Sequence, residues 1–431
     1  MHLSCAGIGV GPSNLSLSCL LHSYPEIRGV FFERKKTFSW YEGMLLPGTG
    51  LQVAIFKDLV TLSDPRSFYS FVSYLHETGK LYHFVNARFD DVPRKEFENY
   101  MKWASRHNDL VHFDEEVVEV GLCRDDMFEV RTTKRRVQAA NISVGVGISP
   151  HVPSCADGFP DDDQFHVSHF LQKVGNVAGK RVVVVGGGQS GAEAFLNLIS
   201  REGDAAPAAV SWVSRRENFL PMDDSPFTNE YFMPCHSDHF FSQDSEYRSS
   251  FVRRNILASD GVSERTLRAI YQRIYTLRLI EARPPVILLA PNRSVEGLSR
   301  AAGAWSLELQ SFPGDRRESI ATDKIVWATG FRKAATDFLA QLADRFEWEG
   351  DEIRIDNDFA AVWDGPPGRR IFLLNAARRQ RGLPDPNLSL LAWRSQRVLE
   401  RINGQPVSRP KAQPAFIPWS GDPLGPSKIA V

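Results

Sequence analysis

Residues 180–193, KRVVVVGGGQSGAE, contain in order the three parts of a dinucleotide-binding turn. The four valines at 182–185 predict a strand buried on both faces of a parallel sheet, and residues 192–199 have helical character. Between them, Gly186 permits a tight turn, Gly188 lets the backbone approach a pyrophosphate, and Gly191 lets the helix lie close to the strand. The helix N-terminus then offers free N–H groups to phosphates. A glycine-rich turn without a ligand is the alternative, and the strand–turn–helix context disfavours it.

A second turn of the same kind stands at the N-terminus. Residues 3–9 predict a short apolar strand that runs into GIGVGP, and residues 13–24 carry the apolar positions of a helix. Pro12 suits the first position of that helix. The turn positions are taken by Gly7, Gly9 and Gly11.

The strands that follow the two turns end in opposite charges. The strand at 30–32 ends in Glu33, and an acid about twenty residues beyond the glycines binds ribose hydroxyls. The strand predicted at 210–214 ends in Arg215 and Arg216, and arginines at this place favour a 2′-phosphate, hence NADPH rather than NADH. The alternative for Glu33 is a solvated carboxylate without a ligand, and the alternative for the two arginines is an exposed pair without a ligand. Two such turns in one chain predict two nucleotide cofactors, a flavin and a nicotinamide.

Length and composition set the outer bounds. The 431 residues suffice for two or three domains, and a net charge of −1 gives no reason to expect nucleic acid or a membrane surface as a partner. No apolar run approaches the roughly 18 residues that span a bilayer, and the N-terminus lacks the basic region of a signal peptide. Five scattered cysteines without a CxxC pair indicate reduced thiols and a cytoplasmic location.

Other stretches give weaker signals. A helix is expected over 84–107, paired strands over 117–122 and 127–132, and a helix entered through a proline-bounded turn over 384–402. A strand at 324–327 ends in Thr329 and Gly330. The cluster of Cys235, His236, Asp238 and His239 has no common zinc spacing, so no metal site is expected. By composition alone, Lys57 either extends to solvent or holds an anionic ligand, with the first favoured.

Six segments in order make the sequence resemble the flavin-dependent N-hydroxylating monooxygenases, which include the lysine and ornithine hydroxylases of hydroxamate siderophore pathways. They are GIGVGPSNLSLS, LQVAIFKDLVTLSDP, GGGQSGAE, DDSPFTNEYF, VWATGF and DPNLSLLAWRS. The resemblance covers nearly the whole chain except the tail. It implies an α/β fold with two Rossmann-like domains, for FAD and NADPH, and a smaller, mainly helical substrate lobe. The domains are expected at 1–165 with 320–402 (FAD), 166–218 with 278–319 (NADPH), 219–277 (lobe) and 403–431 (a proline-rich tail).

The resemblance also assigns residues by matched position. The substrate residues are expected to be Lys57, which would hold a carboxylate, with Asn229 and Ser389. FAD is expected at Gly7, Gly9, Gly11, Pro12, Glu33, Trp40 and Gln52. NADPH is expected at Gly186, Gly188, Gln189, Ser190, Gly191 and Arg215, and a further cofactor contact at Thr329 and Gly330. No acid–base residue is expected, because the chemistry belongs to the flavin.

The implied reaction is hydroxylation of a terminal side-chain amine by NADPH and O2 through a flavin C4a-hydroperoxide. We expect L-lysine as substrate, with L-ornithine or a diamine (putrescine or cadaverine) as alternatives, and a homo-oligomer, dimer or tetramer. Ser259-Asp260-Gly261 is closer to the lysine branch, DDSPFTNE looks more like the ornithine branch, and Arg381 stands where many members have histidine. A carboxylate-holding Lys57 would repel a diamine.

Three other classes share parts of this pattern. A disulfide reductase with two nucleotides needs a redox cysteine pair, which is lacking. A Baeyer–Villiger or general flavin monooxygenase usually has an FxGxxxHxxxWP-like linker, where this chain has FHVSHFLQKVGN. An NADPH-sensing protein would not need the first turn.

Overall fold

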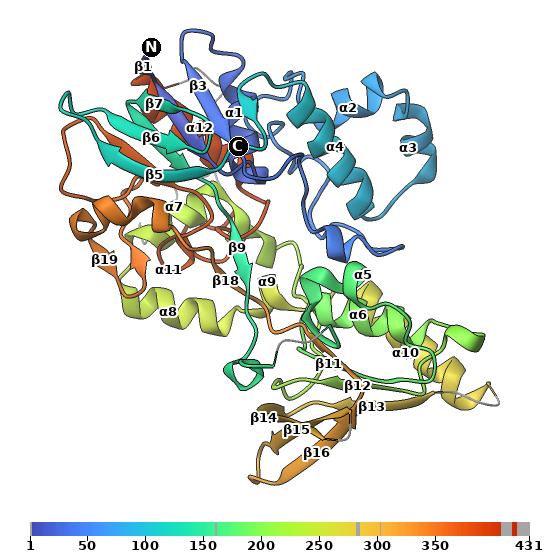
Figure 1. The fold of residues 1–431 in the computed structure, drawn as a ribbon. Coiled ribbons are helices and arrows are strands. Elements are labelled where there is room, and N and C mark those ends of the chain that lie inside the picture. The colour runs from blue at the N-terminus through green and yellow to red at the C-terminus, as the bar shows by residue number, and fades with distance from the viewer. Residues whose placement is uncertain (1, 160–161, 282–284, 302, 407–415, 420–431) are drawn as a thin grey trace.

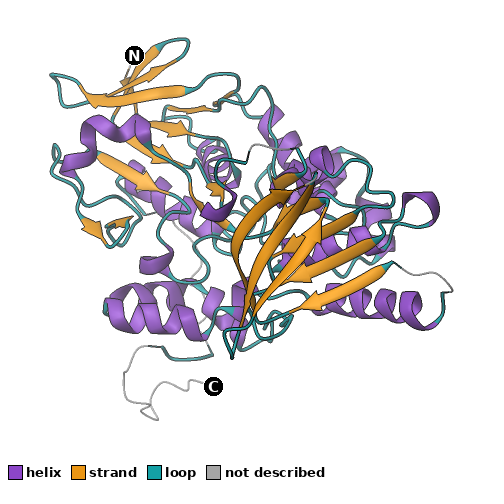
Figure 2. Cartoon of the chain, turned by 60° about the horizontal axis from the view of Figure 1, so that its bottom comes forward, coloured by secondary structure: helices purple, strands orange, loops and turns teal. Residues whose placement is uncertain are grey.

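A computed structural model describes residues 2–159, 162–281, 285–301, 303–406 and 416–419. The described part contains two units, each built on a five-stranded parallel sheet, with further helices beside them (Figure 1). In Figure 2 the strands form two separate groups, each flanked by helices. The predicted fold class, α/β with two Rossmann-like units, is confirmed.

The sheet of the first unit has the order β21-β8-β2-β3-β4, and its strands are all parallel. Successive side chains of β3 alternate between the two faces of this sheet, as a strand requires. Phe31 packs into the core formed with helices α1, α4 and α12, whereas Val30 and Phe32 pack into the core on the other face. The bounds are β2 Cys5–Ile8, β3 Gly29–Phe32, β4 Val111–His112, β8 Asn141–Val144, β21 Arg370–Leu373, α1 Pro12–Leu21, α4 Arg94–Arg106 and α12 Leu391–Asn403.

A second, smaller sheet of order β1-β7-β6-β5 covers the other face of the first. The strands predicted over 117–122 and 127–132 are β5 and β6, and they pair antiparallel as expected. The bounds are β1 His2–Leu3, β5 Val117–Leu122, β6 Phe128–Thr132 and β7 Arg136–Ala139.

The single helix predicted over 84–107 is wrong. The structure has α3 (Leu81–Ala87), which follows α2 (Phe71–Glu77), and then α4. Arg88 has a left-handed backbone (φ 48°), which ends α3. Pro93 precedes α4, and a proline restricts the residue before it to extended conformations. The stretch 384–402 has the predicted form, a turn over its first residues followed by α12 from Leu391.

The sheet of the second unit has the order β10-β17-β11-β12-β13. The predicted strand of valines is β11, and it is buried on both faces as expected. Val182 and Val184 face the core with helices α6 and α10, while Val183 and Val185 face the antiparallel sheet β14-β15-β16. The strands are β10 Gln164–His166, β11 Arg181–Val185, β12 Ala209–Val213, β13 Val286–Ala290, β14 Arg293–Ala301, β15 Ala304–Ser311, β16 Arg317–Thr322 and β17 Lys324–Trp327.

The pairing in this sheet differs from the domain boundaries expected at 165 and 320. β10 and β17 lie in the second sheet, although those boundaries put β17 and most of β10 in the first unit. The chain crosses between the units through β9 (Ile148–Pro150) and β18 (Phe331–Lys333), which pair antiparallel (Figure 1). Sequence could not place the crossing, because a short strand does not reveal its partners.

Residues 219–277 are mainly helical as expected, but they do not form one lobe. The 3-10 helix Thr228–Phe232, α7 (Pro234–Ser242), α8 (Ser245–Arg254) and α9 (Leu257–Asp260) share an apolar cluster with Leu383 of the first unit. We call these elements the lobe. Helix α10 (Glu264–Leu279) instead packs Ile270 and Leu277 into the core of the second unit, beside α6 (Gln189–Ile199).

Short elements complete the fold. They are α5 Phe170–Lys173, α11 Arg378–Arg381, the hairpin β19 Trp348–Glu349 with β20 Glu352–Ile353, and 3-10 helices at Glu42–Met44, Ser154–Ala156, Val167–His169, Gly203–Ala205 and Asp337–Arg345. Most of the tail predicted at 403–431 lies outside the described residues. Of its described part, Trp419 packs edge-on against His236 of the lobe, with ring centroids 4.6 Å apart. No described helix is long and apolar enough to cross a membrane.

One buried ion pair joins the two units. Arg94 of α4 donates from both terminal nitrogens to the Glu193 carboxylate of α6, at 2.8 and 2.7 Å, and also to the Met44 carbonyl. The two side chains are 13% and 4% exposed. A pair so withdrawn from water costs most when one partner alone is removed.

We expect Glu193→Gln to destabilise the protein by about 3 kcal/mol, because it leaves the Arg94 charge buried without its partner. Thermal unfolding of the purified protein measures the effect as a lower melting temperature. Glu347→Gln is the control, since its pair with Arg354 has both side chains more than half exposed. Equal melting temperatures for the two variants would contradict the prediction.

Candidate active site

The first glycine turn has the predicted strand–turn–helix form. A Cβ on Gly7 would lie 2.0 Å from the Phe31 ring, and Gly9 has φ +79° beside the Gly145 carbonyl. Gly11 caps α1, and Pro12 is its first residue, as expected. A Cβ on Gly11 would meet nothing closer than 3.7 Å. Gly7 and Gly9 are therefore required by the fold, whereas the space at Gly11 is open to a ligand at the helix N-terminus.

Glu33 lies at the end of β3, directly beside this turn. Its Oε2 accepts a hydrogen bond from the Val10 backbone N–H at 2.8 Å, and its Oε1 accepts one from the Lys35 N–H at 3.0 Å. The carboxylate is thus held in one orientation beside the turn. Each oxygen keeps a lone pair, so it is able to accept from ribose hydroxyls.

Trp40 and Gln52 lie on the loops that follow. Trp40 packs edge-on against Tyr41, with centroids 5.0 Å apart, and also contacts Phe97 of α4. The Gln52 side-chain nitrogen is buried, yet it has no hydrogen-bond partner among the described residues. Leaving a buried donor unpaired costs about 1–3 kcal/mol, so Gln52 points to a ligand with an acceptor at this place.

The second glycine turn is packed against β17. A Cβ on Gly186 (φ +133°) would lie 2.0 Å from the Ala328 carbonyl oxygen, and one on Gly191 would lie 2.2 Å from the Gly186 oxygen. Gly188, the N-cap of α6, has only the Asp260 carbonyl within 4 Å of such a Cβ. The pattern matches the first turn: two glycines are needed for packing, and the one at the helix N-terminus leaves room.

The side chain of Gln189 is already engaged. Its Nε2 donates to Glu193 and Thr266, and its Oε1 accepts from the Ser263 N–H, which ties α6 to the start of α10. A contact of Gln189 with NADPH would therefore come from its backbone. Ser190, the next residue of the helix, is half-buried.

The two arginines after β12 have different environments. Arg216 donates to the carbonyls of Gly187 and Asp260, at 3.3 and 2.9 Å, and so supports the turn itself. Arg215 is exposed, and in the described part of the chain its side chain has no hydrogen bond or ion pair. We propose that Arg215 is the residue that meets a 2′-phosphate.

Thr329 and Gly330 lie where the chain leaves β17. The Thr329 hydroxyl donates to the His151 carbonyl, and Gly330 has φ +88°. The His166 ring, with Nε2 2.9 Å from the Gly330 oxygen and Nδ1 accepting from the Ser168 N–H, holds this corner. Burial lowers the pKa of His166 to about 4, so at neutral pH the ring is neutral and its Nε2–H is the donor.

Lys57 is carried by a turn that its neighbour fixes. The buried Asp58 carboxylate accepts from the backbone N–H groups of Val60, Thr61 and Phe71. Lys57 is half-buried, and burial lowers its pKa. Its ammonium lies 5.9 Å from the centre of the Phe232 ring, and among the described residues no carboxylate pairs with it. Lys57 is therefore a partly desolvated cation for which the described part of the chain supplies no anion.

The other two predicted substrate residues lie on separate elements. Asn229 is exposed on the 3-10 helix that also carries Phe232, and its Nδ2 donates to the Asp224 carbonyl at 2.8 Å. Ser389 is buried in the loop before α12, where its N–H donates to the Asn387 side chain. The structure thus brings the segment of Asn229 to Lys57 through Phe232. In the described ranges, no hydrogen bond joins Ser389 to either residue.

Sequence reasoning missed Phe232 and Arg94. Phe232 lies within the quoted segment DDSPFTNEYF, so it was available as a signal, but nothing local indicates which residue it faces.

The cluster around Cys235 does not form a set of metal ligands, because Asp238 pairs with Arg381 and Arg397. In the described residues no group of three or more His, Cys, Asp or Glu side chains is placed to hold a metal ion.

The sequence profile described as L-lysine 6-monooxygenase/L-ornithine 5-monooxygenase matches residues 1–333. The chain belongs to this family. The L-lysine N6-monooxygenase of Escherichia coli is 35% identical over 415 residues, covering 96% of this chain and 97% of that protein. The FAD-bound cadaverine monooxygenase of the Erwinia amylovora desferrioxamine pathway has a TM-score of 0.91 at 26% identity, over 97% and 98% of the two chains. The Kutzneria ornithine N-hydroxylase has a TM-score of 0.85 at 30% identity, over 94% and 99%.

The family member described here is an FAD-dependent monooxygenase that uses NADPH and N-hydroxylates an amine. The residues present fit both cofactors. For FAD there are the open helix N-terminus at Gly11, the oriented Glu33 carboxylate and the unpaired Gln52 nitrogen. For NADPH there are the open N-terminus at Gly188 and the free Arg215. Membership of this family decides against the disulfide reductase and NADPH-sensor alternatives.

We expect Arg215→Ala to raise the KM for NADPH about tenfold or more, because the 2′-phosphate loses its counter-charge. A tenfold increase corresponds to a loss of about 1.4 kcal/mol of binding free energy. The KM for NADH, which has no such phosphate, should stay the same and serves as the control. Steady-state NAD(P)H oxidation measures both constants. A parallel rise for the two nucleotides would show that Arg215 supports the fold instead.

Proposed function

We propose that the protein hydroxylates the N6 amine of L-lysine as a step in siderophore or related secondary-metabolite biosynthesis. The observation that carries the proposal is Lys57, a half-buried cation without an anionic partner among the described residues. A substrate carboxylate would neutralise it. The E. coli relative, named for lysine and 35% identical, supports the choice of amino acid.

The chain's own residues orient the substrate and exclude water. When bound, FAD reduced by NADPH supplies the activation of O2. Lys57 anchors the carboxylate at one end of the amino acid, so that the terminal amine extends away from it. The Phe232 ring beside Lys57 limits hydration of that charge, which strengthens the anchor.

The amine must also lose its proton before it becomes a nucleophile. An alkylammonium has a pKa near roughly 10.4 in water, and a site that desolvates it favours the neutral form. The same effect is visible on Lys57 itself, whose pKa burial lowers. The site therefore promotes the reaction by its low polarity and needs no dedicated base.

Two relatives are named for substrates other than lysine. The Erwinia enzyme is named for cadaverine and the Kutzneria enzyme for ornithine. A diamine places a second cation against Lys57, which costs binding energy. Ornithine is one methylene shorter than lysine, and a single methylene in such a site changes the rate constant kcat/KM by about 10–200-fold. Dimer or tetramer formation stays a prediction of the resemblance, and a cytoplasmic location stays a prediction from the cysteines.

Mass spectrometry of the products from lysine, ornithine, cadaverine and putrescine tests the proposal, with NADPH consumption and peroxide release followed in parallel. We expect N6-hydroxylysine as the main product and kcat/KM for lysine at least about tenfold above the others. A preference for ornithine or a diamine would replace the substrate. Peroxide without any hydroxylated amine would refute the proposal as a whole.

Replacing Lys57 tests the anchoring step. Lys57→Met keeps most of the side-chain volume but removes the charge, so the KM for lysine should rise about tenfold or more while flavin reduction by NADPH persists. Cadaverine is the matched control, because it is lysine without the carboxylate, and its KM should fall or stay unchanged. Equal increases for lysine and cadaverine would contradict a carboxylate role.

A further inference from the structure

Arg381 is one of the largest fully buried side chains of the protein, with 1% of its surface exposed. Its guanidinium lies between two phenylalanine rings, 4.2 Å from the centre of Phe241 and 4.5 Å from that of Phe359. Phe241 belongs to α7 of the lobe and Phe359 to the first unit. A planar cation between two ring faces is a geometry that lysine cannot reproduce.

The polar contacts of Arg381 also bridge these two parts. One terminal nitrogen donates to the Asp238 carboxylate of α7 at 3.0 Å, and the other donates to the Asn357 backbone carbonyl and side chain. Arg397 of α12 adds a second hydrogen bond to the same Asp238 oxygen at 2.6 Å. Helix α7 is therefore held to the first unit by two arginines on one carboxylate.

Helix α7 is continuous with the substrate-facing part of the lobe. It begins at Pro234, two residues after the 3-10 helix that carries Asn229 and Phe232. Phe232 is the ring beside the Lys57 ammonium. A displacement of α7 thus moves the wall of the site that contains Lys57.

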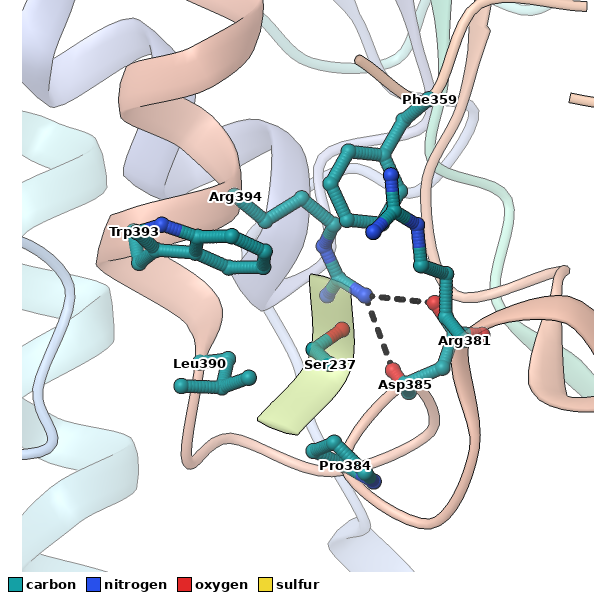
Figure 3. Close-up of a pocket in the computed structure, with 8 residues that line it drawn as sticks. All are labelled: Ser237, Phe359, Arg381, Pro384, Asp385, Leu390, Trp393 and Arg394. Carbon is teal, nitrogen blue, oxygen red and sulfur yellow. Dashed lines mark hydrogen bonds and ion pairs between the residues drawn. The ribbon is translucent and has the colours of Figure 1, made fainter. Parts of the chain in front are cut away.

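Arg381 is the last residue of α11, and the loop that carries Ser389 follows it directly. This loop packs Leu383 into the apolar cluster that contains Phe232. Asp385 in the same loop accepts from the Ala377 N–H and pairs with the buried Arg394 of α12 at 3.0 Å. Figure 3 shows Arg381, Asp385 and Arg394 around one small cavity, with Ser237 of α7 beside them.

We propose that Arg381 is a positioning residue, which fixes the distance between the lobe segment of Asn229 and Phe232 and the loop of Ser389. It thereby holds the substrate amine in a position where oxygen transfer to the amine is faster than release of hydrogen peroxide. The inference rests on the proposed function. In the coupled reaction, RNH2, O2, NADPH and H⁺ give RNHOH, NADP⁺ and H2O. When the amine is misplaced, O2, NADPH and H⁺ give H2O2 and NADP⁺.

The test uses the FAD-loaded enzyme with Arg381→Lys, which keeps the charge but loses the planar guanidinium and its second terminal nitrogen. We expect the KM for the amine to rise about tenfold and the yield of hydroxylated amine per NADPH to fall at least about twofold, with peroxide making up the difference. The rate of flavin reduction by NADPH should change less than about twofold. Arg354→Lys is the matched control, an exposed arginine of the same unit paired with Glu347, and should behave as the wild type.

Asp238→Asn is the second variant, because it removes the ion pair and leaves Arg381 between its rings. It carries the test if Arg381→Lys does not retain FAD, and the same increase in KM and in peroxide is expected. An unchanged KM and unchanged product yield, with only a lower melting temperature, would overturn the proposal and leave Arg381 a purely structural residue. Failure of the wild type to hydroxylate any of the four amines would instead refute the proposed function, and this inference with it.

Discussion

The bidentate ion pair between Arg94 and Glu193 fixes how the two nucleotide-binding units meet. Glu193 lies one turn into the helix that follows the second glycine turn, and Arg94 opens the helix packed against the first unit's α1. Because the fork geometry of a guanidinium accepts one orientation of a carboxylate, the pair sets both distance and angle. The residues of the two cofactor sites can therefore act together only while this contact holds.

A second set of charges places the lobe. Three residues of α11 reach different neighbours: Arg378 pairs with Asp260, Arg379 with Asp351, and Arg381 with Asp238. Two of these acids belong to the lobe, whose apolar cluster is small and includes Leu383 of the first unit. A lobe with so little core depends on such contacts for its position. The lobe, which carries the Phe232 ring beside Lys57, is thus held to the first unit by ion pairs separate from the one that joins the two cofactor units.

Sequence reasoning succeeded where the chemistry is local. The turns at Gly7–Gly11 and Gly186–Gly191, their flanking strands, the helix start at Pro12 and the family itself all followed from short segments, because sterics at a glycine and the period of a buried strand act within a few residues. It failed at the break between α3 and α4 and at the sheet partners of β10 and β17. A left-handed residue such as Arg88 is not signalled by its type, and strand pairing depends on segments far along the chain.

At the proposed substrate site, too, local sequence predicts residue roles but not which distant residues meet. The sequence by itself predicts that Lys57, Asn229 and Ser389 hold the substrate, because the three segments that contain them resemble segments of the family. Only the tertiary structure decided that, within the described ranges of the chain, Lys57 and Arg215 have no charged partner while Arg216 donates to two carbonyls. Only it revealed that Arg381 pairs with Asp238 of the lobe and donates to Asn357 of the first unit. Charge and type are written in the sequence, but whether a charge has a partner depends on folding distant segments together.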